Sequence, residues 1–66
     1  MSERLHEVIV IDLNGEHIDH FNTNYVSRIG EEIEIGRRSY NVKRVIHVTG
    51  SSYIKIVVSG PYPIEL

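Results

Sequence analysis

The stretch "EEIEIGRRSYNVKRVIHV", residues 31–48, alternates Ile, Tyr and Val with charged or polar residues and is interrupted by Gly36. Alternation with a period of two residues is typical of a β-strand that has one buried face. The stretch therefore predicts two strands, at 31–35 and 39–48, joined by a turn that carries Arg37 and Arg38.

Two turn lengths are compatible with this hairpin. A four-residue turn sets Glu32 opposite Lys43, whereas a two-residue turn sets Glu32 opposite Asn41. Both arrangements keep the apolar side chains on one face of the hairpin. Because a cross-strand pair of opposite charges contributes about 0.2–1 kcal/mol, we expect the four-residue turn.

Arg44 breaks the pattern of the second strand. Strict alternation places it on the same face as Tyr40, where an unpaired Arg inside a small core would be costly. Either Arg44 lies at the rim of the core, or a β-bulge at 43–44 reverses the alternation and turns Val45 and His47 inward. Long strands in small barrels bend through such bulges, so we favour the bulge.

Three further strands are predicted outside this stretch. Residues 5–13 and 16–23 form a hairpin around Asn14-Gly15, a dipeptide that suits a two-residue type I′ turn. Residues 53–59 form the last strand, and residues 60–66 end the sheet because each proline there lacks an amide donor.

The chain is predicted to form one domain, residues 1–66, with an all-β fold. No segment repeats its apolar residues with the period of an α-helix, so we expect no long helix. Short strands at regular spacing indicate a five-stranded antiparallel meander, curled into a sheet or a small barrel of the SH3-like or OB-like type.

The small size of the chain limits its core. A domain of 66 residues buries only ~60% of the surface of its unfolded chain, and the absence of Cys excludes disulfides and thiolate metal sites. Val8, Ile9, Val10 and Ile11 are apolar on both faces of their strand. Either residues 24–30 or the C-terminal tail cover this strand, or it mediates self-association, which would supplement the core.

Enzymatic chemistry and membrane insertion are not expected. His17 and His20 are three residues apart, so on a strand they point to opposite faces and do not form a metal site. No serine lies in a nucleophile motif, and no phosphate-binding motif is present. We therefore predict no cofactor, no metal and no catalysis. No signal sequence precedes the short apolar run at 8–11, which indicates an intracellular, cytoplasmic protein.

Charge is distributed unevenly along the chain. The net charge is −2, but acidic residues dominate 1–35 and residues 36–64 contain only basic ones. The halves could simply pair as neighbouring strands and leave the basic turn solvated. Alternatively, Arg and Tyr side chains here suit a partner protein, or an anionic small molecule or nucleic acid. The candidate binding residues are Arg37, Arg38, Tyr40, Arg44 and Tyr53, with Lys43 and Lys55 nearby.

A resemblance to a known group rests on three short motifs. They are Asn14-Gly15, Ile29-Gly30-Glu31, and the strand that carries Tyr40, Val42, Arg44, Val45 and His47. Over residues 8–58 the chain resembles small uncharacterised β-barrel proteins of bacteriophages and mobile elements. The resemblance implies an accessory protein that binds and modulates a host protein, for example as a defence inhibitor. An alternative that it implies is an oligomeric binder that sequesters a nucleotide signal. It assigns no functional residue.

Overall fold

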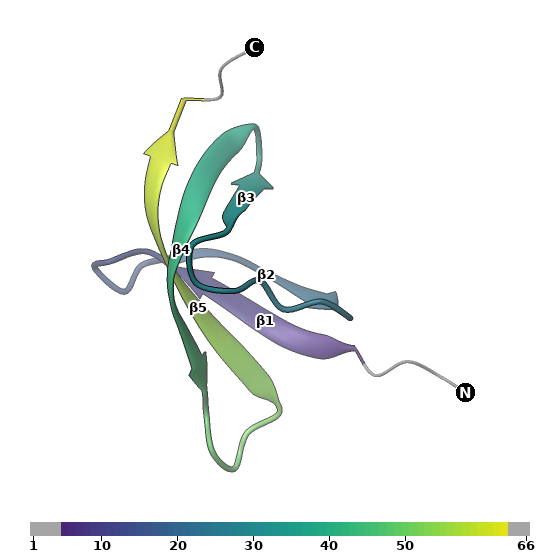
Figure 1. Ribbon diagram of the computed structural model, residues 1–66. Helices are drawn as coiled ribbons and strands as arrows, with labels where there is room; N and C mark the ends of the chain where they lie inside the picture. Colours follow the sequence, from purple (N-terminus) through teal and green to yellow (C-terminus); the bar gives the residue numbers. More distant parts are fainter. Residues whose placement is uncertain (1–4, 64–66) are drawn as a thin grey trace.

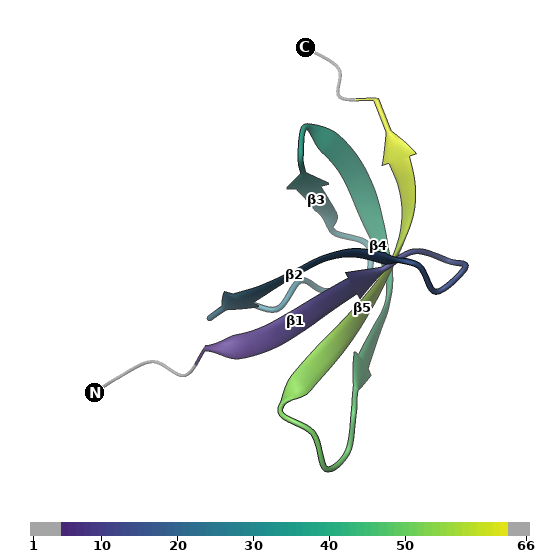
Figure 2. The same cartoon turned by 180° about the vertical axis from the view of Figure 1, so that it is seen from behind.

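The computed structural model describes residues 5–63 and contains one curled β-sheet (Figures 1 and 2). The expected all-β fold of five strands is confirmed. Residues 5–63 include no helix, and therefore none that is long and apolar enough to cross a membrane. The strands are β1 (His6–Ile11), β2 (His17–Thr23), β3 (Glu32–Ile35), β4 (Arg38–His47) and β5 (Tyr53–Tyr62).

The order of the strands differs from the expected antiparallel meander. The order across the sheet is β2-β1-β5-β4-β3, and β1 pairs with β5 in parallel. In a meander, β1 and β5 would be the two edge strands, and each would have only one neighbouring strand. Both strands have apolar side chains on both faces, so the central position buries more apolar surface and explains the order.

The core lies on the concave, inner face of the curled sheet. It is formed by side chains from the three central strands: Val8, Val10, Tyr40, Val42, Ile54, Ile56 and Val58. Side chains from the edge strands, from the loop after β2 and from the end of β4 pack around it: Ile18, Phe21, Val26, Ile33, Ile35 and Val45. The other face of the sheet, which we call the outer face, is covered by no second layer in the described part of the chain.

The first hairpin is confirmed, but its turn is not the expected two-residue type I′ turn. The Asp12 amide donates to the Glu16 carbonyl at 2.9 Å, and the Gly15 amide donates to the Asp12 carbonyl at 3.0 Å. Gly15 has φ +85°, so the loop has three residues and ends in a left-handed glycine. The Asp12 carboxylate also accepts the amides of Asn14 and Glu16, which favours this longer loop.

The second hairpin has the two-residue turn, so the favoured four-residue register is wrong. Ile35 pairs with Arg38 and Glu32 pairs with Asn41, so Glu32 does not face Lys43. Gly36 and Arg37 have φ +58° and +66°, which are the two positive values that a type I′ turn requires. This turn matches the twist of the strands, an advantage that outweighs one exposed ion pair.

Arg37 is a non-glycine residue in the left-handed region, which costs roughly 1–2 kcal/mol. We expect Arg37→Gly to raise the free energy of unfolding by about 0.5–1 kcal/mol, since glycine relieves this strain but loosens the unfolded chain. Thermal unfolding followed by circular dichroism measures the change. Arg38→Gly, at the first position of β4, is the control and should destabilise the protein; a lower melting temperature for Arg37→Gly would contradict the turn assignment.

Strand β5 continues beyond residue 59, where the sequence predicted that the sheet ends. Ser59 pairs with Asn41 and Tyr62 pairs with Ser39, so β5 has one more residue than β4 between these pairs. Pro61 did not end the strand because it lies within this irregularity, where a missing amide donor disrupts no regular ladder bond. The strand ends at Tyr62, directly before Pro63. The extension places Tyr62 beside β4, and residues 64–66 lie outside the described residues.

Glu31 organises the loop between β2 and β3. Its carboxylate accepts hydrogen bonds from the Arg28 amide and from the Tyr25 hydroxyl, the latter at 2.8 and 3.0 Å. The Arg28 amide bond, followed by the Tyr25 bond, lowers the pKa of the Glu31 carboxyl below its ordinary value. The same hydrogen bond to Glu31 raises the pKa of Tyr25. The loop is thus held by a charged group.

Glu31→Gln is expected to destabilise the protein at neutral pH but not in acid. A carboxyl whose pKa is lowered by folding contributes stability above its ordinary pKa, and this contribution is lost as the pH falls through the lowered value. The free energy of unfolding in urea, measured over a series of pH values, should therefore converge for wild type and Glu31→Gln at low pH. Glu16→Gln serves as the control; a constant difference at all pH values would show that the charge of Glu31 plays no part.

Candidate functional site

The five predicted binding residues do not form one site. Tyr40 is only 6% exposed and belongs to the core, so its ring is not presented to a partner. This corrects its assignment as an exposed anchor. The physical reason is its position: Tyr40 lies opposite Ile33 on the inner face, where burial of an aromatic ring contributes most to stability.

Arg37 and Arg38 form an exposed tip at the turn between β3 and β4. Neither forms an ion pair with a described residue. Arg44 lies six positions after Arg38 in β4, a distance of about 20 Å along an extended strand. The tip is therefore a separate surface from the one that contains Arg44 and Tyr53.

The expected β-bulge in β4 is confirmed. Val42 pairs with Val58 and Arg44 pairs with Val57, so β4 has an extra residue, Lys43, at this point. Arg44 is exposed and Val45 packs against the core, as the bulge predicted. His47 pairs with the core residue Ile54, so it lies on the inner face as the bulge predicted, but it is exposed because the strand ends there. The bulge turns Lys43 and Arg44 together toward the outer face.

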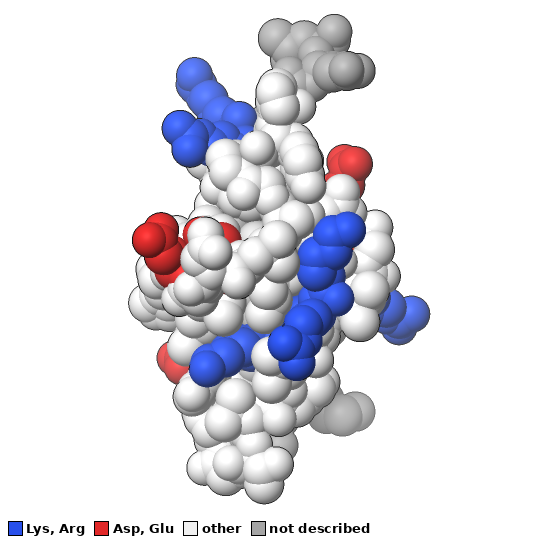
Figure 3. Space-filling view, turned by 90° about the vertical axis from the view of Figure 1, so that its left-hand side faces the viewer, with Lys and Arg blue, Asp and Glu red and all other residues white. Residues whose placement is uncertain are grey.

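Lys55 joins these two side chains on the outer face. It lies on β5 opposite Ile46 of β4. Val57, the partner of Arg44, is two residues further along β5 and therefore on the same face as Lys55. We call Lys43, Arg44 and Lys55 the basic band. None of the three forms an ion pair with a described residue. Figure 3 shows Lys and Arg side chains grouped across the middle of this side of the molecule, apart from a second group near the top.

Apolar side chains surround the basic band. Val57 is 8% exposed, and Ile9, Ile11 and Ile46 are half-buried, although no second layer of described residues covers them. Ile9 pairs with Lys55 and Ile11 pairs with Val57 across the parallel ladder. Because β1 has a hydrogen-bonded neighbour on each side, it cannot associate edge to edge with a second copy. Contact through this strand would have to use its outer face.

Tyr53 lies at one end of the outer face. It is half-buried and pairs with Glu7 of β1. A shallow cavity of about 380 Å³ nearby is lined by residues that include His6, His47 and Tyr53. Strand β5 separates the two histidines, and residues 5–63 contain no group of three His, Cys, Asp or Glu side chains that could hold a metal ion.

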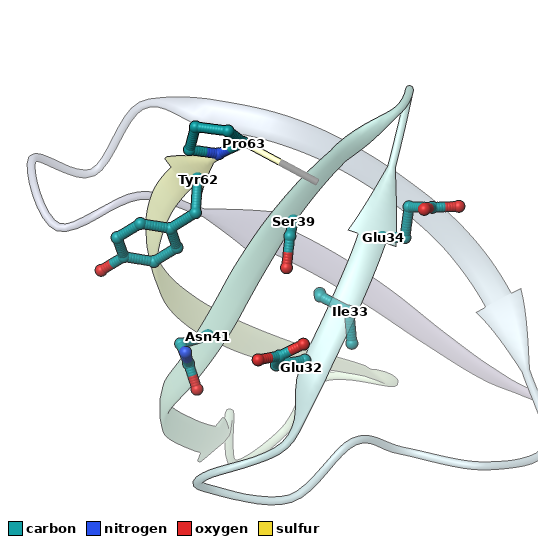
Figure 4. A pocket seen from close by; sticks show the side chains of 7 residues that line it. All are labelled: Glu32, Ile33, Glu34, Ser39, Asn41, Tyr62 and Pro63. Atoms are coloured by element: carbon teal, nitrogen blue, oxygen red, sulfur yellow. The ribbon is translucent and has the colours of Figure 1, made fainter. Parts of the chain in front are cut away.

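A second cavity, of about 550 Å³, lies at the opposite end of the outer face. It is formed where β3, β4 and the extended end of β5 meet (Figure 4). Its lining is polar and acidic with two ring side chains: Glu32, Ile33, Glu34, Ser39, Asn41, Tyr62 and Pro63. Sequence reasoning missed this cavity because it ended the last strand before Tyr62.

The outer face is therefore divided into an acidic, hollowed end and a basic, apolar middle. The sequence indicated Arg44 and Tyr53 and named Lys43 and Lys55 as neighbours. It did not indicate Ile46 or Val57, whose outward position depends on the bulge and on the strand order. Comparisons of the chain with protein-family models, with curated proteins and with solved structures find no match.

Proposed function

We propose that this protein is a non-enzymatic interaction protein that binds a partner protein through the outer face of its sheet. The observation that supports this most is the basic band. Its three cations, which have no ion pair with the described residues, lie among apolar side chains that no second layer covers. A charged and apolar surface of this kind is suited to an acidic protein surface that has its own apolar centre.

The composition of the outer face favours a protein over a nucleic acid as the partner. Nucleic-acid binders are as a rule basic, and their affinity depends on many phosphate contacts. This chain has a net charge of −2, and the band has only three cations, with Ile9, Ile46 and Val57 between or beside them. Apolar residues of this kind contribute to binding a folded surface but add little to phosphate contacts.

The resemblance to bacteriophage and mobile-element proteins supports a protein of the bacterial host as the partner. In this role the protein would act by occupying a surface of the host protein, as an inhibitor does. The cytoplasm is then the compartment in which both proteins meet. A nucleotide or nucleic-acid partner is the alternative that the experiment below distinguishes.

The double variant Lys43→Glu/Arg44→Glu is expected to lose the partner. Tagged wild type, this variant and Arg37→Glu/Arg38→Glu are each incubated with nuclease-treated lysate of the bacterium that carries the gene. Both variants reverse two exposed cations on β4 or its turn, so they are matched in charge. Quantitative mass spectrometry should find one protein that is retained by wild type and by the tip variant but depleted about tenfold or more with the band variant.

Three results would count against the proposal. The tip variant could lose the partner while the band variant keeps it. Wild type could retain proteins from a parallel untreated lysate but none from the nuclease-treated one, which would indicate a nucleic acid. Or calorimetric titration with nucleotides could give saturable heat that the band variant abolishes, which would favour an anionic ligand. Circular dichroism of each variant confirms that it is folded.

A further inference from the structure

The cavity at the acidic end of the outer face presents polar groups that have no partner in the described chain. The side chains of Glu32, Ser39 and Asn41 form no hydrogen bond or ion pair with residues 5–63. Ser39 and Asn41 are nevertheless half-buried. Because these groups are not engaged within the described chain, they are free to form hydrogen bonds with a ligand that enters the cavity.

The cavity has a fixed wall opposite these groups. The Tyr62 hydroxyl donates a hydrogen bond to the Ser59 hydroxyl oxygen at 3.0 Å, and Ser59 is itself 7% exposed. This bond restrains the orientation of the Tyr62 ring, which remains 45% exposed. Figure 4 shows the ring on one side of the cavity and the Glu32, Ser39 and Asn41 side chains directed into the space beside it, whereas Glu34 is directed away.

The charges and shapes in the cavity define the ligand class. All side-chain oxygens of Glu32, Ser39 and Asn41 can accept hydrogen bonds, and the cavity lining contains no cation. An aromatic ring attracts a cation over its face. A guanidinium group is planar, donates several hydrogen bonds in a fixed fork and stacks on aromatic rings. An ammonium group is a compact charge with three rotatable donors and has no planar face to stack.

We propose that this cavity binds an arginine side chain of a partner protein. In this arrangement the Glu32 carboxylate accepts from the guanidinium, Asn41 and Ser39 accept from its remaining donors, and the Tyr62 ring stacks on it. The protein source of the arginine rests on the proposed function, because the cavity shares a face with the basic band. Recognition of a guanidinium does not rest on it. The partner would thus offer an acidic area to the band and an arginine to the cavity.

The test uses the whole chain and two short peptides that differ in one group. Acetyl-Gly-Arg-Gly-amide carries the guanidinium, and acetyl-Gly-citrulline-Gly-amide replaces it with a neutral urea of nearly the same shape. Amide chemical shifts of ¹⁵N-labelled protein are followed during titration with each peptide. We expect saturable shifts at Glu32, Ser39, Asn41 and Tyr62 with the arginine peptide, and at least about threefold weaker binding of the citrulline peptide.

Variants assign the contact to the cavity. Glu32→Gln keeps the size of the side chain but removes its charge, and should weaken the arginine peptide by about as much as citrulline does. Glu16→Gln, in the first hairpin, removes one charge elsewhere and should bind as wild type does. Tyr62→Leu should also weaken binding. The spectra report folding of each variant directly, so loss of binding is separated from loss of structure.

The outcomes separate this proposal from the proposed function. Shifts that are absent, that are equal for both peptides or that survive Glu32→Gln would overturn the arginine site, whatever the band binds. Arginine binding by Lys43→Glu/Arg44→Glu at the wild-type affinity, together with failure of that variant to lose any lysate protein, would leave the site standing and overturn the proposed function and with it the protein source.

Discussion

Replacing Ile56 by Ala is expected to unfold a large fraction of the protein at room temperature. Ile56 is 1% exposed and lies at the centre of the sheet, paired with Val10 on one side and Val45 on the other. Truncation of a buried Ile to Ala costs about 2–5 kcal/mol. Domains are stable by only ~0.05–0.15 kcal/mol per residue, so a chain this short has little stability to spare.

Urea denaturation measures this effect, with Ile29→Ala as the matched control. Ile29 is 67% exposed in the loop after β2, so the same truncation should change the free energy of unfolding by less than about 0.5 kcal/mol. Ile56→Val, which removes one methylene group, should fall between them at about 0.5–1.5 kcal/mol. If Ile56→Ala were as stable as Ile29→Ala, Ile56 could not lie at the centre of the core.

Gly60→Ala is expected to destabilise the protein by about 2–3 kcal/mol. Gly60 has φ +125°, a conformation that residues with a side chain rarely adopt. A Cβ atom there would also lie 3.0 Å from the Ser39 carbonyl oxygen and 3.1 Å from Cδ1 of Tyr40. The first neighbour is backbone and the second is a core ring, so neither can move without disturbing the pairing of β4 with β5.

Gly50→Ala separates the two causes. Gly50 has φ +82° in the turn between β4 and β5, and no atom lies within 4 Å of the position of an added Cβ. Its replacement should therefore cost only the backbone strain, roughly 1 kcal/mol. Thermal unfolding of both variants gives the comparison. Equal effects would show that the end of β5 does not approach β4 as closely as described, and the Tyr62 cavity would then lose its support.

The bulge at Lys43 could be predicted because it avoids the large free-energy cost of burying the Arg44 side chain. Without it, alternation would have placed the Arg44 guanidinium in the core, and the cost of burying an unpaired charge far exceeds that of a local irregularity. The all-β fold was predictable for a similar reason, since the period-two pattern of residues 31–48 is incompatible with a helix that buries one face.

The register of the second hairpin was not predictable from pairing energies. The two candidate registers keep the same faces and differ in one exposed pair, Glu32 with Lys43 or with Asn41. Such a pair contributes less than about 1 kcal/mol. The backbone conformation at Gly36 and Arg37 decided the matter, and a non-glycine residue with φ +66° gives no clear sequence signal.

The position of β5 next to β1 could have been inferred from the apolar residues on both faces of each strand. Such strands are typical of the centre of a sheet. The candidate site depended on this position. Arg44 and Tyr53 lie on neighbouring strands that a meander would also pair, whereas Ile9 and Ile11 lie beside them only because β5 pairs with β1. The Arg37–Arg38 tip is remote from Arg44 and Tyr53. Tyr40 has the residue type of an interface anchor but the register of a core residue.

The affinity of the captured partner for three proteins tests the role of the outer face most directly. Calorimetry at fixed ionic strength compares wild type, Lys43→Glu/Arg44→Glu and Arg37→Glu/Arg38→Glu. If the basic band is the contact, the band variant should bind about ten- to a hundredfold more weakly, while the tip variant stays within about threefold of wild type. Wild-type affinity of the band variant, together with weakened binding of the tip variant, would contradict binding through the outer face.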